Sequence, residues 1–228
     1  MEKVVVSLGG SILVPGEDDA QYHRELATLF QDLSTRLKLF VVTGGGRVAR
    51  YYIETGRALG IRERTLDEFG IAVTRLNARL LAAILDPRTN REPATTYAEA
   101  ARLSKRNSIV MMAGTTPGHT TDFVSASLAR VVHADRIVNA TSVDGVYDAD
   151  PKKDPTARLL DRLRFEDLVA LTGKGHDAAG PSVVFDPAAA RVLLRTRTPL
   201  HVVHGRDLKA LRAAIVGDPF HGTRVSDG

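Results

Sequence analysis

The sequence predicts an α/β fold with a mainly parallel central sheet. Short apolar runs rich in β-branched residues alternate with longer segments whose apolar residues recur at helical spacing. The alternation continues along the whole chain, and strands that alternate with helices form parallel sheets. A chain of 228 residues is long enough for one large domain or two small lobes around a well-filled core.

The first half of the chain contains three predicted strands, at residues 3–8, 39–43 and 108–112. Three predicted helices lie between them, at residues 21–37, 47–59 and 67–85. Gly60 ends the second helix, because glycine readily adopts the left-handed conformation that follows a helix. Pro87 ends the third helix, because the residue before a proline resists the α conformation.

The second half of the chain continues this alternation. Predicted strands are at residues 136–140 and 200–203, and predicted helices are at residues 122–133, 165–171, 187–195 and 207–215. Thr120 or Thr121 can cap the helix that begins at Asp122, because a threonine hydroxyl accepts a hydrogen bond from the first helical turn. The tail GTRV could add a last short strand, and the turn-rich residues 148–155 could mark a seam between two lobes.

The composition excludes several classes of protein. There are no cysteines, which rules out disulfides, a Cys-zinc site and a thiol nucleophile and suits a reducing compartment. The 7 histidines form no HxxxH or HExxH pair. The 31 basic residues are interleaved with 27 acidic ones, and aromatic content is 5%, so we expect no nucleic-acid partner but a preference for small anionic substrates. With no signal peptide and no apolar run of about 20 residues, we expect a cytoplasmic protein without a membrane partner.

Four loops that follow predicted strands carry the chemistry. They are rich in glycine or polar residues and cover residues 9–11, 44–46, 114–122 and 141–150. In a parallel sheet the carboxyl ends of neighbouring strands lie at one edge, where ligands bind. If the strands are neighbours, the four loops therefore line one site.

The loop GGGRVAR has the clearest phosphate-binding features. Three consecutive glycines, residues 44–46, let the backbone approach an anion, and the following helix offers unpaired N–H groups at its positive end. Arg47 and Arg50 are one helical turn apart, so one or both can reach the same ligand. The alternative is an ordinary strand–helix turn with solvated arginines.

The same loop formally fits a dinucleotide-binding fingerprint. Gly44, Gly46 and Ala49 have the required spacing, and Asp67 follows after about 20 residues. The acidic residue of that fingerprint should end a second strand, whereas the sequence around Asp67 is typical of a helix. We therefore disfavour a dinucleotide site.

The loop GTTPGHTTD is rich in hydroxyl groups. Two glycines bracket a proline, four threonines supply hydroxyls, and His119 adds an imidazole. Such a loop can bind sugar hydroxyls, base edges and phosphate oxygens. The alternative is a loop with a structural role only, which caps the helix that follows it. A single histidine of this kind is more often a loop hydrogen-bonder than a catalyst.

The fourth loop, SVDGVYDADPKKDP, combines a DG turn with an aromatic residue. Tyr147 on an exposed turn can stack on a base. Asp148, Asp150 and Asp154 could hold a metal, but a solvated acidic loop is favoured, and Lys152, Lys153 and Lys174 are expected at the surface. No Walker A or GxSxG sequence is present. Together the four loops indicate a site for two anionic ligands and hence phosphoryl transfer, which depends on positioning and charge neutralisation.

Seven segments carry a resemblance to a known family. They are SLGGSIL, VTGGGRVARYYIE, TLDEFGIAVTRLNARLL, GTTPGHTTD, VDGVYDADPKKDP, VVFDPAAARVL and the closing GT, in this order over nearly the whole chain. The set resembles the amino-acid kinase superfamily and, within it, the archaeal-type uridylate (UMP) kinases. The resemblance implies a three-layer αβα sandwich that forms one domain over residues 1–228. It implies an acceptor-binding part at about 1–135, an ATP-binding part at about 136–228, a homohexamer, and Mg²⁺-dependent transfer from ATP to UMP.

The resemblance also implies roles for individual residues. Asp122 and Arg50 would be catalytic, with Asp122 organising the centre and Arg50 on phosphate. Those implied to bind ATP are Gly9, Gly10, Ser11, Gly45, Arg50, Thr141, Tyr147 and Asp150. Those implied to bind UMP are Gly44, Gly45, Gly46, Asp67, Gly114, Thr115, Thr116, Pro117, Gly118, His119, Thr120 and Thr121. No residue is assigned as a metal ligand.

One position departs from the family pattern. The superfamily commonly has a lysine two residues before the first glycine pair, and this chain has Ser7. The phosphate charge must then be neutralised by Mg²⁺, Arg47, Arg50 or Lys174. This departure keeps two alternatives open: a non-catalytic binder of nucleotides or oxyanions, as in molybdate or tungstate storage proteins, and a kinase of another phosphorylated acceptor.

Overall fold

The computed structural model describes residues 1–14, 19–149, 151, 154–173 and 185–227. Within these residues one seven-stranded sheet crosses the molecule in the order β3-β2-β1-β4-β6-β7-β5. The strands are β1 (Lys3–Leu8), β2 (Lys38–Thr43), β3 (Ile109–Met112), β4 (Arg136–Thr141), β5 (Arg162–Leu163), β6 (Leu200–His204) and β7 (Thr223–Val225). The predicted α/β class with a mainly parallel sheet is confirmed.

The five strands from β3 to β6 run parallel, and β7 pairs antiparallel with β6. In the register, Leu8 at the end of β1 lies opposite Thr43 of β2 and Ala140 of β4. The loops that follow β1, β2, β3 and β4 therefore leave the sheet at the same edge.

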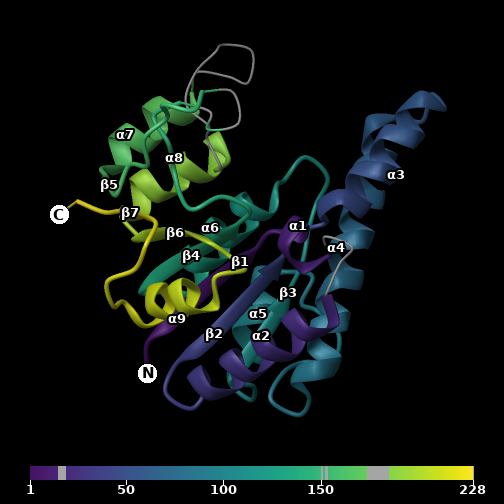
Figure 1. Cartoon of the computed structure of the whole chain (residues 1–228). Coiled ribbons are helices and arrows are strands. Elements are labelled where there is room, and N and C mark those ends of the chain that lie inside the picture. The colour runs from purple at the N-terminus through teal and green to yellow at the C-terminus, as the bar shows by residue number, and fades with distance from the viewer. Residues whose placement is uncertain (15–18, 150, 152–153, 174–184, 228) are drawn as a thin grey trace.

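Helices cover both faces of the sheet and give three layers (Figure 1). The helices are α1 (Gly10–Leu13), α2 (Asp19–Leu33), α3 (Gly46–Ala58), α4 (Glu63–Leu85), α5 (Tyr97–Leu103), α6 (Thr121–Val132), α7 (Phe165–Thr172), α8 (Pro187–Thr196) and α9 (Leu208–Val216). Buried residues of α2, α4 and α9 pack on one face, and those of α5, α6, α7 and α8 pack on the other. Helix α3 extends away from the sheet at the end of α4 (Figure 1).

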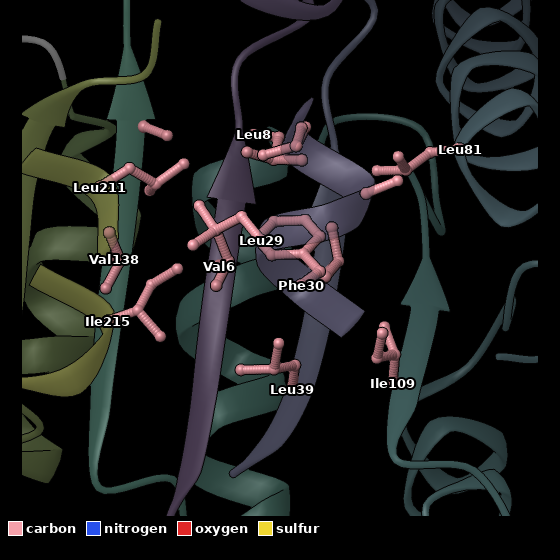
Figure 2. Packing of buried hydrophobic residues seen from close by; sticks show 14 of the residues in the cluster. Val6, Leu8, Leu29, Phe30, Leu39, Leu81, Ile109, Val138, Leu211 and Ile215 are labelled. Atoms are coloured by element: carbon pink, nitrogen blue, oxygen red, sulfur yellow. The ribbon is translucent and has the colours of Figure 1, made fainter. Parts of the chain in front are cut away.

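Alternate residues of each strand face opposite layers of the core. In β1, Val4 and Val6 pack with the α2–α9 side, and Val5 packs with the α6–α8 side. Figure 2 shows the first side, where Phe30 of α2 lies over the sheet near Val6. Burial on both faces explains why the strands read as continuous apolar runs.

Some element boundaries differ from the prediction. Helix α2 ends at Leu33 and not at residue 37, because the hydroxyls of Ser34 and Thr35 bond back to carbonyls of the last turn. Helix α4 begins at Glu63, four residues earlier than predicted. Because α4 is helical around Asp67, it confirms that no strand ends there.

Helix α5 was missed by the sequence analysis. The hydroxyl of Thr96 caps this helix by accepting from the backbone N–H of Glu99, and the Glu99 carboxylate accepts from the N–H of Thr95. A threonine followed three residues later by a glutamate is a known start signal for a helix and could have been found. The two-residue strand β5 has no comparable signal.

None of the helices in the described part of the chain combines the length and the apolar character needed to cross a bilayer.

Candidate active site

The loops after β1 and β2 are in direct backbone contact. The N–H of Gly44 donates to Leu8 O at 2.8 Å, and the N–H of Gly9 donates to Ala140 O at 2.9 Å. Gly46 has φ of +62°, and a Cβ atom there would overlap the carbonyl group of Gly10. Only glycine allows the two loops to approach this closely.

We call the contact between the glycine loops 9–11 and 44–46 the glycine junction. Arg50 brings a positive charge to it. It projects from the second turn of α3, and its Nη2 donates to Ser11 Oγ at 3.2 Å. Arg47, one turn earlier, is also exposed. Of the two arginines, only Arg50 lines the neighbouring cavity.

A cavity of about 430 Å³ lies between α3, α4 and the loop that follows β3. The structure brings many of the predicted residues to its wall: Gly45, Gly46, Arg50, Asp67, Gly114, Thr116, Pro117, Gly118, His119, Thr120 and Thr121. Other predicted residues do not line it: Gly9, Gly10, Ser11, Gly44, Thr115, Asp122, Thr141 and Tyr147.

Asp67 holds the tip of the loop 114–121. Its Oδ2 accepts from the N–H of Gly118 at 2.8 Å, and Gly118 has φ of +85°. At the end of the loop, Thr120 and not Thr121 caps α6, because its hydroxyl accepts from the N–H of Phe123 at 3.1 Å. The imidazole of His119 lies against the Phe123 ring, with 4.4 Å between centroids. The loop is therefore anchored at both its tip and its end.

Asp122 lies in the first turn of α6, beside Ser7, which stands where the superfamily commonly has a lysine. Ser7 Oγ donates to Asp122 Oδ1 at 3.4 Å, and the N–H of Asp186 donates to Oδ2 at 3.3 Å. Burial of the carboxyl raises the pKa of Asp122 to about 7, and the nearby Asp186 carboxylate adds to the rise, while the two hydrogen bonds oppose it. Ser7, which is 2% exposed, thus faces the Asp122 carboxylate.

The loop after β4 is tied to the C-terminal strand. The N–H of Val146 donates to Thr223 Oγ1 at 2.8 Å. The hydroxyl of Tyr147 donates to Asp144 Oδ2 at 3.3 Å, and burial, followed by the charge of Asp144, raises the pKa of Tyr147. Thr141 ends β4 at the same edge of the sheet as the other loops.

Two acidic residues of this loop accept hydrogen bonds from backbone N–H groups further along the chain. Asp148 Oδ1 accepts from the N–H of Arg158 at 2.7 Å, and Asp154 Oδ1 accepts from the N–H of Thr156 at 2.8 Å. Asp150 lies outside the described residues, as do Lys152, Lys153 and Lys174. Within the described part of the chain, no three His, Asp or Glu side chains are grouped as a metal site.

Two polar residues of α4 belong to the site without having been predicted from the sequence. Thr74 lines the cavity, and Asn77 Nδ2 donates to Gly44 O at 2.8 Å. Both are 6% exposed. Thr74 and Asn77 follow Asp67 at 7 and 10 residues, which places all three on one side of a helix. This polar stripe was a signal that could have been found.

Comparison with known proteins gives consistent matches over the chain. A family model described as the amino acid kinase family matches residues 2–204. A curated uridylate kinase from Methanoculleus marisnigri is 45% identical over 228 residues, which cover 100% of this chain and 97% of that protein. A curated uridylate kinase from Archaeoglobus fulgidus is 42% identical over 218 residues, which cover 94% of this chain and 98% of that protein.

Solved structures match equally well. The crystal structure of uridylate kinase from Archaeoglobus fulgidus has a TM-score of 0.88 and 40% identity, and the match covers 99% of this chain and 100% of that one. The structure of UMP kinase from Bacillus anthracis has a TM-score of 0.82 at 21% identity, over 99% of this chain and 96% of that one, which supports the fold alone.

Proposed function

The chain belongs to the amino acid kinase family, and from this premise we propose that it is a uridylate kinase, which transfers the γ-phosphoryl group of ATP to UMP. The observation that carries the proposal is identity of 40–45% to curated uridylate kinases over essentially their whole length. The cavity beside the glycine loops supplies a site where a nucleotide could bind, because its wall includes Arg50, Asp67 and threonine hydroxyls.

UMP would bind in the cavity of about 430 Å³. The threonine hydroxyls of the loop 114–121 would bind its base and phosphate. Asp67 uses Oδ2 to hold Gly118 N–H, which leaves Oδ1 to accept from the ribose hydroxyls. In this arrangement the same carboxylate shapes the loop and binds the nucleotide.

ATP would bind on the other side of the glycine junction, in the part of the domain formed by residues from about 136 onward. The N–H groups of Gly10, Ser11 and Gly45 would face its phosphates, and Arg50 would add the positive charge. The glycine loop 44–46 would lie between the two nucleotides. Thr141 and Tyr147 would line the adenosine side. Asp150, which we also predict there, lies outside the described residues.

Mg²⁺ is the metal ion that we propose for this reaction. Such ions usually bind one or two carboxylates in addition to substrate phosphates. Asp122 and Asp186 fit this requirement, because the N–H of Asp186 donates to Asp122 Oδ2 at 3.3 Å, which brings the two acidic residues together. These two residues would hold the ion. When bound, Mg²⁺ would neutralise charge on the transferred phosphoryl group.

The transfer would proceed in line. An oxygen of the UMP phosphate attacks the γ-phosphorus of ATP, the bond to the bridging oxygen breaks, and ADP leaves with UDP as the product. No Walker A or GxSxG sequence is present, and we expect no covalent enzyme intermediate. Phosphoryl transfer depends on positioning and electrostatics. We therefore propose that the closely packed glycine loops act mainly by positioning the two nucleotides.

An acceptor panel tests the proposal. Purified protein would receive ATP, Mg²⁺ and, separately, UMP, CMP, AMP, carbamate and isopentenyl phosphate, with nucleoside diphosphates and ADP measured by chromatography. We expect UDP from UMP at the highest kcat/KM. Turnover of another acceptor without UDP would contradict the proposal, and ATP binding without any turnover would favour a binding protein.

Replacement of Arg50 by alanine should impair catalysis. We expect kcat/KM for UDP formation to fall by about 10- to 100-fold, the scale of one charged hydrogen bond. Steady-state kinetics with both substrates varied would measure it. Arg47→Ala is the matched comparison from the same helix, and we expect a change below about threefold because Arg47 does not line the cavity. A larger loss in Arg47→Ala than in Arg50→Ala would assign the phosphate contact to Arg47.

We propose a cytoplasmic homohexamer in pyrimidine nucleotide synthesis. Large apolar side chains remain exposed on α3, on α4 and at Leu59 between them, which supports association of copies through this surface: Tyr51, Tyr52, Leu59, Phe69, Leu76 and Leu80. Light scattering coupled to size-exclusion chromatography would measure the mass, and a monomeric protein would contradict the proposal.

A further inference from the structure

One turn of α4 contacts both loops that surround the cavity. Asn77 Nδ2 donates to Gly44 O at 2.8 Å, and the N–H of Gly114 donates to Thr74 Oγ1 at 2.9 Å. Gly44 opens the glycine loop after β2, and Gly114 opens the threonine-rich loop after β3. Two side chains less than one helical turn apart therefore connect the two halves of the site.

The hydroxyl of Thr74 both donates and accepts a hydrogen bond. It donates to Ile71 O at 2.7 Å, and it accepts from the N–H of Gly114. A third bond joins the same turn to the sheet, because Thr43 Oγ1 at the end of β2 donates to Thr74 O at 2.8 Å. Strand β2, helix α4 and the Gly114 loop are thus held in one hydrogen-bonded unit (Figure 1 shows their arrangement).

These polar groups lie within an otherwise apolar face of α4. The other buried residues of this helix are Leu66, Val73, Ala78, Leu81, Ala82 and Leu85. A core helix needs no polar residues, and a buried polar group costs stability unless it is hydrogen-bonded. Thr74 and Asn77 occur where the helix passes the two loops, which indicates that their function is to hold those loops.

We infer that Thr74 and Asn77 are positioning residues that set the distance between the glycine loop 44–46 and the threonine-rich loop 114–121. The assignment of nucleotides to the loops rests on the uridylate kinase function proposed above. In-line transfer needs the reacting atoms about 3–3.5 Å apart, and a misplacement of about 1 Å can cost about 100-fold in rate. The two side chains affect the reaction by way of the loop backbone and make no contact with the reacting atoms.

The two residues should give different kinetic signatures. Thr74→Val removes the hydroxyl without changing side-chain volume and leaves Gly114 N–H unpaired, so we expect KM for UMP to rise about tenfold. Asn77→Leu frees the Gly44 carbonyl beside the transferred phosphate, so we expect kcat to fall about tenfold with KM for UMP within about twofold of wild type. A general loss of packing would not divide KM and kcat in this way.

Matched variants separate position from stability. Thr74→Ser keeps the hydroxyl and should recover wild-type KM to within about threefold, whereas Asn77→Asp keeps the shape but removes the donor and should behave like Asn77→Leu. Thr28→Val in α2 is the control, because the Thr28 hydroxyl also bonds a helical carbonyl, at 2.9 Å from Arg24 O, but at an exposed site. Thr28→Val should be silent in both constants.

The experiment measures steady-state kinetics with both substrates varied. UMP affinity is measured by calorimetry without ATP, and exchange of the Gly114 amide by NMR. Folded Thr74→Val and Asn77→Leu proteins with both constants within about twofold of wild type would overturn the inference, as would equal proportional losses in both variants. If wild-type protein binds UMP without forming UDP, the proposed function fails, and the UMP affinity and amide exchange of Thr74→Val still decide the role of Thr74.

Discussion

Replacement of Asp122 by asparagine should nearly abolish UDP formation, with a loss in kcat of at least about 1,000-fold. The carboxylate lies where α6 begins, beside Asp186, and we propose that it organises the catalytic centre and helps to hold the metal ion. Asparagine keeps the shape and one acceptor oxygen but supplies no negative charge. Steady-state kinetics at saturating ATP, UMP and Mg²⁺ would measure the loss.

The same substitution should stabilise the protein in metal-free buffer. Burial raises the pKa of Asp122 from 3.8 to about 7 in the folded state. The unfolded chain therefore releases this proton at lower pH than the folded chain does. As a result, the ionising carboxyl lowers the free energy of unfolding progressively as pH rises from about 4 to 7. Three pKa units correspond to about 4 kcal/mol, and weakened hydrogen bonds offset part of it, so we expect a net gain of about 1–2 kcal/mol at pH 8.

Urea unfolding at pH 5 and pH 8 would test this pH dependence. The gain in free energy of unfolding should be larger at pH 8, because more of the wild-type carboxylate is then ionised. Asp218→Asn, at an exposed position, is the control and should change neither stability nor kcat. A destabilised Asp122→Asn protein with normal kcat would show that the residue has a structural role only.

Replacement of Gly46 by alanine should impair both folding stability and activity. The residue has φ of +62°, where a Cβ atom is strained, and that atom would overlap the carbonyl group of Gly10. Backbone strain and overpacking together should lower the free energy of unfolding by about 2–4 kcal/mol. Because the Cβ forces the two glycine loops apart, kcat should fall by about 100-fold or more.

Gly60→Ala is the matched control for the effect of backbone strain at positive φ. Gly60 also has positive φ, +75°, but a Cβ there would meet no atom within 4 Å. We expect a stability loss of about 1 kcal/mol and unchanged kcat. Urea titration and steady-state kinetics on both variants would separate the two effects. Equal stability losses in both variants, with normal kcat in Gly46→Ala, would mean that the loops can move apart without consequence.

Much of the fold followed from local patterns in the sequence. Buried parallel strands need apolar residues on both faces, so β1 and β2 appear as continuous apolar runs. Helix α6 begins after a threonine whose side chain caps it. The parallel order then places four loops at one edge, which the sequence analysis expected. The elements that were missed, α1, α5 and β5, are all short, and of these α5 carries a capping signal.

The contacts within the site depended on tertiary structure. Asn77 and Gly44 are 33 residues apart, Thr74 and Gly114 are 40 apart, and Asp122 and Asp186 are 64 apart. Hydrogen bonds over such separations are set by how α4 and α6 pack on the sheet, which local residue patterns do not specify.

The sequence by itself therefore determined which loops gather at the edge of the sheet and which residue types they present there. The tertiary structure decided that Ser7 faces Asp122, that Arg50 reaches Ser11, and that the glycine loops touch. The physical reason is that side-chain periodicity fixes the face of each element that is buried, whereas the packing of the layers fixes which distant side chains come within hydrogen-bonding distance.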